Sequence, residues 1–153
     1  MRAIALWCLA CLLLAGAGRV EAKVGDALET FTSGPVMNQL RLNASGQMAL
    51  SGALAGRTLH RFVSDDGAIT VDVIVWNGAV EQLLMYLPGE ERRGVQVSMF
   101  LQHAVGSVFG AQQGILAFRA AVLNRRETSL AWGGYTMRFT PLDRGLLRVQ
   151  VSR

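Results

Sequence analysis

The chain has 153 residues, 51% of them hydrophobic, and a formal net charge of +4. Its two cysteines, Cys8 and Cys11, both lie in the first 22 residues. The remainder therefore cannot build a disulfide framework, a thiol nucleophile or a zinc–thiolate site. His60 and His103 are the only histidines, which excludes a multi-histidine metal site. No nucleophile elbow, phosphate-binding loop or dinucleotide-binding fingerprint occurs, so we expect no metal and no cofactor.

Residues 1–22 have the pattern of a secretory signal peptide. Arg2 supplies the positive charge, residues 3–14 form an unbroken apolar run, and Val20-Glu21-Ala22 fits a small-residue cleavage site. The run is short for a membrane span, although an uncleaved N-terminal anchor is the alternative. We predict cleavage near Ala22 and export of residues 23–153, a single α+β domain, to the periplasm or the extracellular space.

Asn77-Gly78 is the strongest local signal in the chain. It separates two apolar runs, and Asn followed by Gly suits a type I′ hairpin, which needs two positive φ angles. A two-residue loop predicts these cross-strand pairs: Val75 with Val80, Val73 with Gln82, Val71 with Leu84 and Ile69 with Tyr86.

Asp66-Gly67 predicts a second turn one strand earlier, so that three strands form a meander. It sets Phe62 against Val71 and His60 against Val73 on an apolar face. On the other face Arg61 falls opposite Asp72, and we expect an exposed ion pair there.

Helical periodicity dominates the middle of the chain. Apolar residues recur with the spacing of one helix face, which predicts a helix near residues 94–109. They are Val97, Phe100, Leu101, Ala104, Val105, Val108 and Phe109. Residues 112–124 fit either a helix or a strand, and residues 23–56 give weak signals. After Ser33-Gly34-Pro35 we expect a short helix with Val36 and Leu40 inward, and residues 47–54 stay unassigned.

The last segment predicts a second meander. Gly133-Gly134 places Leu130 opposite Met137 and Thr128 opposite Phe139, and a loop at residues 143–145 then sets Phe139 opposite Val149 and Met137 opposite Val151. We therefore expect an α+β fold in which about five to seven antiparallel strands pack against one main amphipathic helix. Whether the meanders form one sheet or two is left open.

Charge and aromatic residues indicate a partner-binding surface. Residues 89–153 carry nine arginines against four acidic residues, whereas residues 23–88 are slightly acidic. Arg138 and Arg148 fall on the polar face of the second meander, and Trp76 and Trp132 flank the two hairpin turns. We take these four as candidate partner-binding residues, for a protein or an envelope component and not for nucleic acid.

His60, Gln82 and His103 are the candidate ligand-binding residues. The predicted register puts His60 on the apolar face near Gln82, where an imidazole beside an amide suits a ligand contact or a base. No catalytic residue is assigned.

Residues Gly133-Gly134-Tyr135-Thr136-Met137 are similar to the C-terminal motif of periplasmic copper chaperones, which carry Gly-Gly-Tyr-His-x-Met. Thr136 stands where that family has its metal-binding histidine, and the methionine spacing differs by one residue. We therefore expect the five methionines after residue 22 to pack in the core and not to bind copper.

These observations favour an exported, non-catalytic binding domain that acts on a protein or envelope partner. One alternative is a small periplasmic hydrolase or isomerase with a His60 pocket. The other is membrane association through residues 100–122, where Gly106, Gly110 and Gly114 form a small-residue stripe. The oligomeric state is left unassigned.

Overall fold

Tight turns set the strand order. In the computed structural model, which describes residues 23–153, Asn77 and Gly78 both have positive φ, as do Gly133 and Gly134. This left-handed backbone is what the type I′ turn predicted at Asn77-Gly78 requires, and the turn predicted at Gly133-Gly134 has it as well. The turn at residues 65–68 places Phe62 opposite Val71, as predicted.

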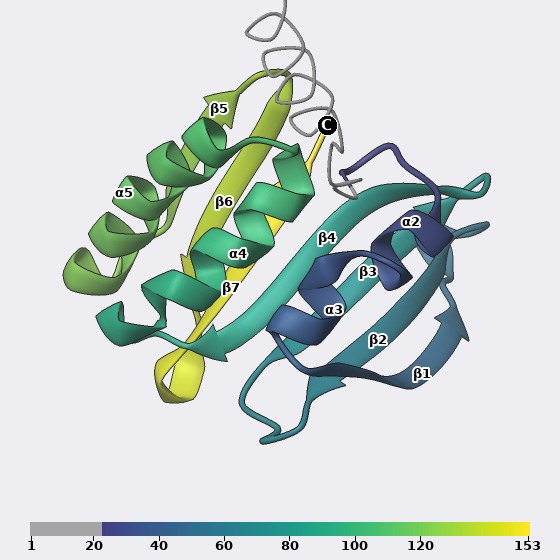
Figure 1. Ribbon diagram of the computed structural model, residues 1–153, viewed down its shortest axis with the longest axis horizontal. Helices are drawn as coiled ribbons and strands as arrows, with labels where there is room; N and C mark the ends of the chain where they lie inside the picture. The colour runs from purple at the N-terminus through teal and green to yellow at the C-terminus, as the bar shows by residue number, and fades with distance from the viewer. Residues whose placement is uncertain (1–22) are drawn as a thin grey trace, which may run out of the picture.

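A single antiparallel sheet contains all seven strands, in the order β1-β2-β3-β4-β7-β6-β5. Antiparallel pairing of β4 with β7 joins the two predicted meanders, which settles the question of one sheet or two (Figure 1). The strands are β1 (Leu42–Ala49), β2 (Thr58–Ser64), β3 (Thr70–Trp76), β4 (Ala79–Pro88), β5 (Thr128–Trp132), β6 (Tyr135–Pro141) and β7 (Leu146–Ser152).

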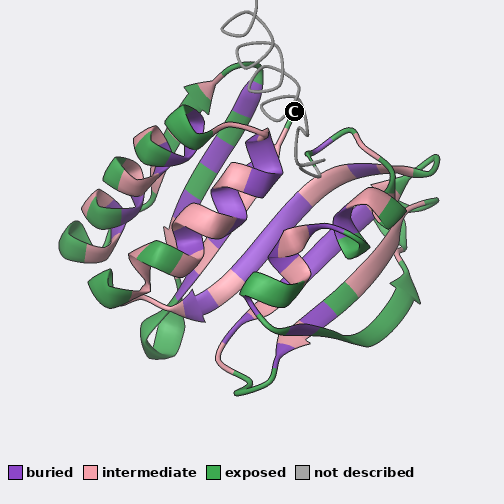
Figure 2. Cartoon of the chain, in the orientation of Figure 1, coloured by how far each residue is buried: buried purple, intermediate pink, exposed green. Residues whose placement is uncertain are grey.

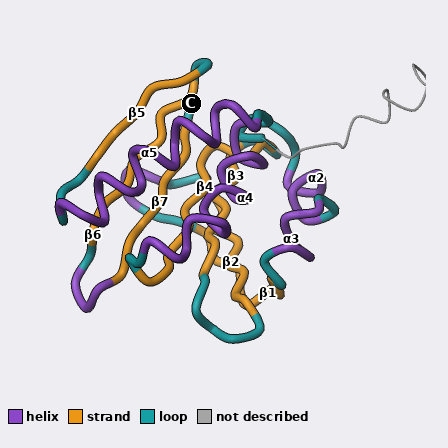
Figure 3. The backbone as a smooth tube through the Cα atoms, turned by 60° about the vertical axis from the view of Figure 1, so that its left-hand side comes forward, coloured by secondary structure: helices purple, strands orange, loops and turns teal. Residues whose placement is uncertain are grey.

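The four α-helices of residues 23–153 lie on one face of this sheet (Figures 1 and 3). Two short ones, α2 (Leu28–Thr32) and α3 (Pro35–Gln39), lie over the β1–β3 half. Two longer ones, α4 (Gly94–Val105) and α5 (Val108–Asn124), lie over the β4–β7 half. We call this side the helix-covered face and the opposite side the open face. The α+β prediction is confirmed, but four helices replace the single main helix that we expected.

The predicted helix at residues 94–109 is interrupted. Gly106 adopts φ 65° and ψ 30° and ends α4, and the Ser107 hydroxyl accepts a hydrogen bond from the Gly110 N–H to begin α5. Left-handed glycine and a serine N-cap are the ordinary signals for a helix end and a helix start. The apolar stripe is therefore buried only up to Val105, while Val108 and Phe109 are exposed.

Residues 112–124 are helical. Phe118 and Ala121 of α5 are fully buried against the sheet, and the glycines of the small-residue stripe let the helix approach it. A Cβ at Gly110 would meet the Trp132 ring at 2.7 Å, and one at Gly114 would meet Leu101 Cδ1 at 2.5 Å. The stripe thus packs inside this domain, and no helix of the described residues is long and apolar enough to cross a membrane.

A β-bulge corrects the predicted register of β3 and β4. Val75 pairs with Val80 as predicted, but the register then shifts by one residue at Glu81. Val73 therefore faces Leu83 instead of Gln82, and Val71 faces Met85 instead of Leu84. Arg57 binds the bulged Glu81 carboxylate through two nitrogens, one of them Nη2 at 2.7 Å, and its guanidinium lies 4.8 Å from the Trp76 ring centroid. Counting residues from the turn cannot reveal such an insertion.

The prediction that the methionines pack in the core holds with one exception. Met85 and Met137 are fully buried, and Met37 and Met99 pack against the core. Met48 lies on the edge strand β1 and is 58% exposed, so it does not belong to the core. Its strand has no neighbour on one side, which leaves that side chain with little to pack against.

Replacing Gly114 with alanine should destabilise the domain by about 1 kcal/mol. Overpacking against Leu101 and Met137, both fully buried, costs roughly 1–3 kcal/mol, and the gain of about 1 kcal/mol in helix propensity offsets part of it. Urea unfolding measures the difference. Gly46→Ala is the matched control, because a Cβ there meets nothing within 4 Å. A Gly114→Ala variant as stable as wild type would contradict this packing.

Acid should weaken the domain through the turn between β2 and β3. The Ser64 hydroxyl donates to Asp66 at 2.6 Å, and this bond, together with the Ala68 N–H, lowers the pKa of Asp66. A lowered carboxyl pKa contributes stability that is complete above the unfolded value, about 4, and is lost as pH falls through the folded value.

Ser64→Ala tests this link. It also removes the hydroxyl that accepts from the buried Ile69 N–H at 3.0 Å, a loss of about 1–3 kcal/mol that does not depend on pH. The difference in unfolding free energy between variant and wild type should therefore be larger at pH 6 than at pH 2.5. A difference that stays constant with pH would show that the Ser64–Asp66 hydrogen bond does not link stability to pH.

Candidate functional site

The predicted ligand-binding residues do not converge. Phe62 packs its ring 5.9 Å from that of Phe31 in α2, which places His60, two residues away on the same strand, on the helix-covered face. The bulge puts Gln82 opposite Ile74, on the open face. His103 is buried in α4, with Nε2 3.3 Å from Gln39 Oε1. His60, Gln82 and His103 therefore do not form one pocket.

The predicted partner-binding residues are divided between the two faces. Arg138 and Arg148 lie on the open face, in β6 and β7. Trp76 is also on the open face, half-exposed beside the Asn77-Gly78 turn and stacked with Arg57. Trp132 lies on the helix-covered face, where its ring covers Gly110. The four residues therefore do not form one patch.

Most arginines on the open face are paired with a carboxylate, so the net charge of this face is small. Arg61 donates to both Asp72 oxygens at 2.7 Å, and Arg138 Nε lies 3.6 Å from Glu127 Oε1. Arg148 has no carboxylate in the described chain within ion-pair distance; its Nη2 donates to Thr140 at 3.4 Å and its Nε is buried without an acceptor. The positive charge expected for this face is thus mostly neutralised.

Asp72 is buried even though no helix covers the open face. It is 2% exposed, so the expected exposed ion pair is wrong in this respect. Side chains of neighbouring strands surround it. Burial and the negative charge of Asp72 raise the pKa of Tyr86, whereas Arg148 and Arg61 lower it. A buried carboxylate held by a bidentate guanidinium stabilises the sheet only while its partner is present.

The outer side of α5 carries exposed apolar side chains at regular spacing. Phe109, Leu116 and Leu123 are 61%, 61% and 66% exposed and stand seven residues apart, with Gln112 and Arg119 between them. We call these five residues the outer stripe. Residues three and four apart lie on one helix face, so the five form a narrow seam of the kind that coiled coils use. Figure 2 shows the exposed residues of α5 turned away from the sheet.

A groove runs beside the outer stripe. It has a volume of about 480 Å³ and lies between the start of α4 and the middle of α5, where Val95, Ile115 and Arg119 line it. Val95 is itself 63% exposed. The stripe and the groove together bring four exposed apolar side chains to this side of the molecule, Val95, Phe109, Leu116 and Leu123, and exposed apolar patches mark interaction sites.

No family model, curated protein or solved structure matches this chain. Among the described residues, no group of three or more His, Cys, Asp or Glu side chains could hold a metal ion.

Sequence reasoning passed over the outer stripe. Its seven-residue spacing is visible in the sequence, but Phe109 was counted in the buried stripe of the preceding helix, and residues 112–124 fitted a strand equally well. Locating the helix break at Gly106 would have revealed the stripe, because a new helix starting at Val108 turns Phe109 outward.

Arg61→Met should destabilise the domain by about 3 kcal/mol, since it leaves the Asp72 carboxylate buried and unpaired. Chemical unfolding at pH 7 measures the loss. Arg138→Met is the matched control on the same face: both members of its ion pair are about half-exposed, so about 0–1 kcal/mol is expected. Equal losses for the two variants would show that burial of Asp72 is unimportant.

Proposed function

We propose that the protein is an exported, non-catalytic binding domain, and that the outer stripe of α5 receives an acidic amphipathic helix of a protein partner. The observation that carries the proposal is the regular exposure of Phe109, Leu116 and Leu123 on a helix whose other side is fixed in the core. Recognition of a helix through anchors at such spacing is a common mode of peptide binding.

The charged residues on and beside the outer stripe favour an acidic partner. The α5 sequence contains no acidic residue, Arg119 lies within the stripe, and Arg125 and Arg126 follow the helix. Glu91 is the acidic side chain that lines the neighbouring groove. Acidic positions beside the apolar anchors of a partner helix would therefore meet unpaired arginines, and a basic helix would be repelled.

The narrowness of the stripe favours a helix over a lipid surface. A helix that lies in a membrane interface presents a broad apolar side with its charges on the opposite side. Here Gln112 and Arg119 alternate with the apolar residues along the same line, so a flat insertion would bury both. A partner helix can instead pack its side chains between them.

The test uses two synthetic peptides with the same apolar heptad positions, one carrying glutamate and the other lysine at the flanking positions. Wild-type protein should bind the glutamate peptide at least about tenfold more tightly, measured by calorimetry. Arg119→Glu should reverse that preference, because the sign of the facing charge changes. Leu116→Asp should abolish binding of both peptides, since it puts a charge at the centre of the seam.

Controls separate this surface from the open face and from membranes. Arg138→Glu/Arg148→Glu changes two charges on the open face and should leave peptide binding intact. Loss of binding in that variant alone would instead assign the interaction to the open face. Sedimentation with anionic phosphatidylglycerol vesicles that Leu116→Asp abolishes, without any preference between the peptides, would replace the protein partner with a lipid surface.

A further inference from the structure

The first described residues are fixed by backbone hydrogen bonds to two different elements. The Val24 N–H donates to the Ala104 carbonyl in the last turn of α4 at 3.0 Å, and the Gly25 N–H donates to the Val80 carbonyl at the start of β4 at 2.7 Å. The Val24 side chain is 1% exposed and belongs to the core, whereas Lys23 is exposed. The chain therefore has a fixed position from Val24 onward.

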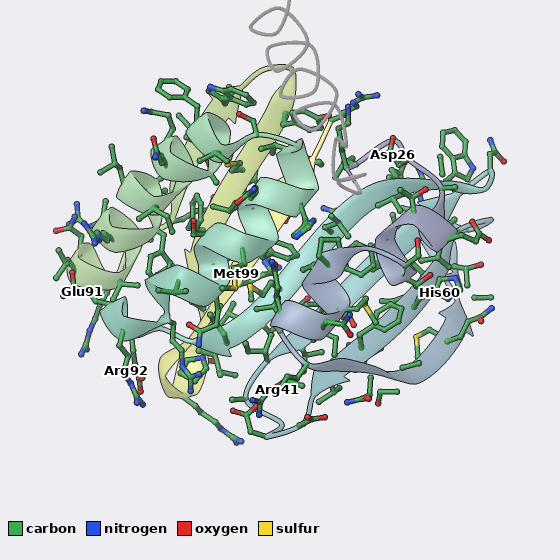
Figure 4. The ribbon with its side chains drawn as sticks, in the orientation of Figure 1. Asp26, Arg41, His60, Glu91, Arg92 and Met99 are labelled. Atoms are coloured by element: carbon green, nitrogen blue, oxygen red, sulfur yellow. The ribbon has the colours of Figure 1, made fainter. Side chains whose placement is uncertain are left out.

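Asp26 directs its carboxylate back to the backbone nitrogen of Lys23. The Lys23 N–H donates to Asp26 Oδ2 at 3.0 Å, and the Asp26 N–H donates to the Lys23 carbonyl at 3.0 Å, so the two residues close a tight turn. Figure 4 shows Asp26 in the loop that precedes α2. A carboxylate forms its strongest hydrogen bonds with a donor that carries a positive charge, which a peptide N–H does not.

The C-terminal end of α4 also favours a positive charge at residue 23. The neighbouring Val24 N–H is bonded to one of the last carbonyls of this helix. The Lys23 side chain lies over Gly106, the residue that ends α4, where an added Cβ would meet Lys23 Cδ at 2.8 Å. The last turn of a helix carries a partial negative charge that stabilises nearby cations. Two separate parts of the chain thus suit a cation at the Lys23 nitrogen.

Other charged groups of the described chain lie near this nitrogen. Glu29, in the first turn of α2, adds negative charge, and the Lys23 side chain and Arg153, which reaches Gly25, add positive charge. His103 lies in the last turn of α4 and is buried. The Asp26 carboxylate is the group hydrogen-bonded to the nitrogen, and Coulomb energy falls with distance, so we expect its charge to dominate.

We propose that the Lys23 nitrogen becomes the α-ammonium group of the mature chain, and that Asp26 and the end of α4 form the site that receives it. Val20 and Ala22 are small residues at the two positions that signal cleavage requires, so the sequence places the cut immediately before Lys23. The proposal shares the expectation of export with the proposed function, but it does not involve the outer stripe.

The reaction is hydrolysis of the Ala22–Lys23 peptide bond by a signal peptidase. The oxygen of a water molecule joins the Ala22 carbonyl carbon, the C–N bond breaks, and the proton released by the new carboxyl group is taken up by the new amine of Lys23. A free α-amine has a pKa of about 7.7–8.0, so it is mostly protonated at pH 7. The hydrogen bond from Lys23 to Asp26 thereby becomes an ion pair between the same two atoms.

The experiment measures the pKa of this α-amine in the protein as cells process it. The full chain, with its own N-terminal segment, is expressed with nitrogen-15 label in a bacterial host, and the exported protein is purified. Its intact mass should correspond to a chain that begins at Lys23. An NMR titration should give an α-amine pKa at least about half a unit above that of a free α-amine, a roughly threefold gain in proton affinity. A different first residue, or a pKa within the free range, would overturn the proposal.

Asp26→Asn tests the contact itself, because it keeps an oxygen acceptor and removes the charge. It should return the α-amine pKa to the free range. The matched control is Asp65→Asn, which removes the same charge from a carboxylate that accepts from Asn43 Nδ2 at 2.7 Å. Asp65 and Arg41 line what we call the polar cavity, a space of about 240 Å³ between the α3–β1 junction, the β2–β3 turn and the first turn of α4.

Figure 4 shows Arg41, and with it this part of the molecule, far from Asp26. Asp65→Asn should therefore leave the α-amine pKa as it is in wild type. An equal fall in both variants would contradict the proposal, since it would show an effect of net charge and not of the Asp26 contact. Peptide binding by the outer stripe is measured separately, so failure of one proposal is distinguishable from failure of the other.

Stability provides a second readout of the ion pair. A raised folded-state pKa of an amine contributes stability that is complete below the unfolded value, about 8, and is lost as pH rises through the folded value. The urea midpoint of wild type should therefore exceed that of Asp26→Asn at pH 7, and the difference should shrink at pH 10. A difference that is the same at both pH values would show that the Lys23 nitrogen carries no titrating charge.

Discussion

Pairing of β4 with β7 is the contact on which the rest of the structure depends. β4 is the last strand of the first meander and β7 is the last strand of the second, so this one pairing joins the two meanders. Its inward side chains Leu83, Met85 and Leu87 are essentially fully buried and lie beneath both helical halves. The backbone at Gly25 and Asp26 exchanges hydrogen bonds with Val80 at its start. Without this pairing the outer stripe and the polar cavity would belong to separate, smaller units with little core of their own.

Much of the sheet follows from local rules. A glycine preceded by asparagine, aspartate or glycine fixes a turn, and alternation of apolar and polar residues then decides which side of the strand is buried. Phe62 opposite Val71 and Met137 opposite Val151 follow from these rules alone. Features that depend on distant contacts do not. The bulge at Glu81 is stabilised by Arg57, a residue more than twenty positions away, and nothing near the turn indicates it.

Candidate sites were harder to predict than strands for the same reason. The bulge at Glu81 adds one residue to β4 and so places Gln82 on the opposite face of the sheet from His60. The site predicted from their proximity depended on a register without this insertion. The polar cavity brings together residues from three separate stretches of chain, between Gln39 and Gln96, and exists only because α3 and α4 lie side by side. By contrast, the outer stripe lies on one helix. Its seven-residue spacing is visible in the sequence, but a single predicted helix over residues 94–109 assigns Phe109 to the buried face of α4.

Helix α5 shows how one segment can serve two surfaces. Its inward side is made of small residues and phenylalanine, which lets the backbone lie close to β5 and β6. Because the small residues face the sheet, the larger apolar residues Phe109, Leu116 and Leu123 lie on the opposite side of the helix and are exposed to solvent. Because the inward side of α5 is packed in the core, the backbone that carries the outer stripe is already ordered. Binding of a partner would therefore cost little further conformational entropy in this helix.

The first described residues lie beside the C-terminus, since a Cβ at Gly25 would meet the Arg153 side chain at 2.7 Å. The Val24 N–H also donates a hydrogen bond to the Ala104 carbonyl in the last turn of α4. Figure 1 shows the C-terminus beside the point where the described residues begin, whereas Arg41, which lines the cavity, lies at the far end in Figure 4. The first described residues and the C-terminus therefore lie on one side of the molecule, with the cavity on the opposite side and α5 along the flank.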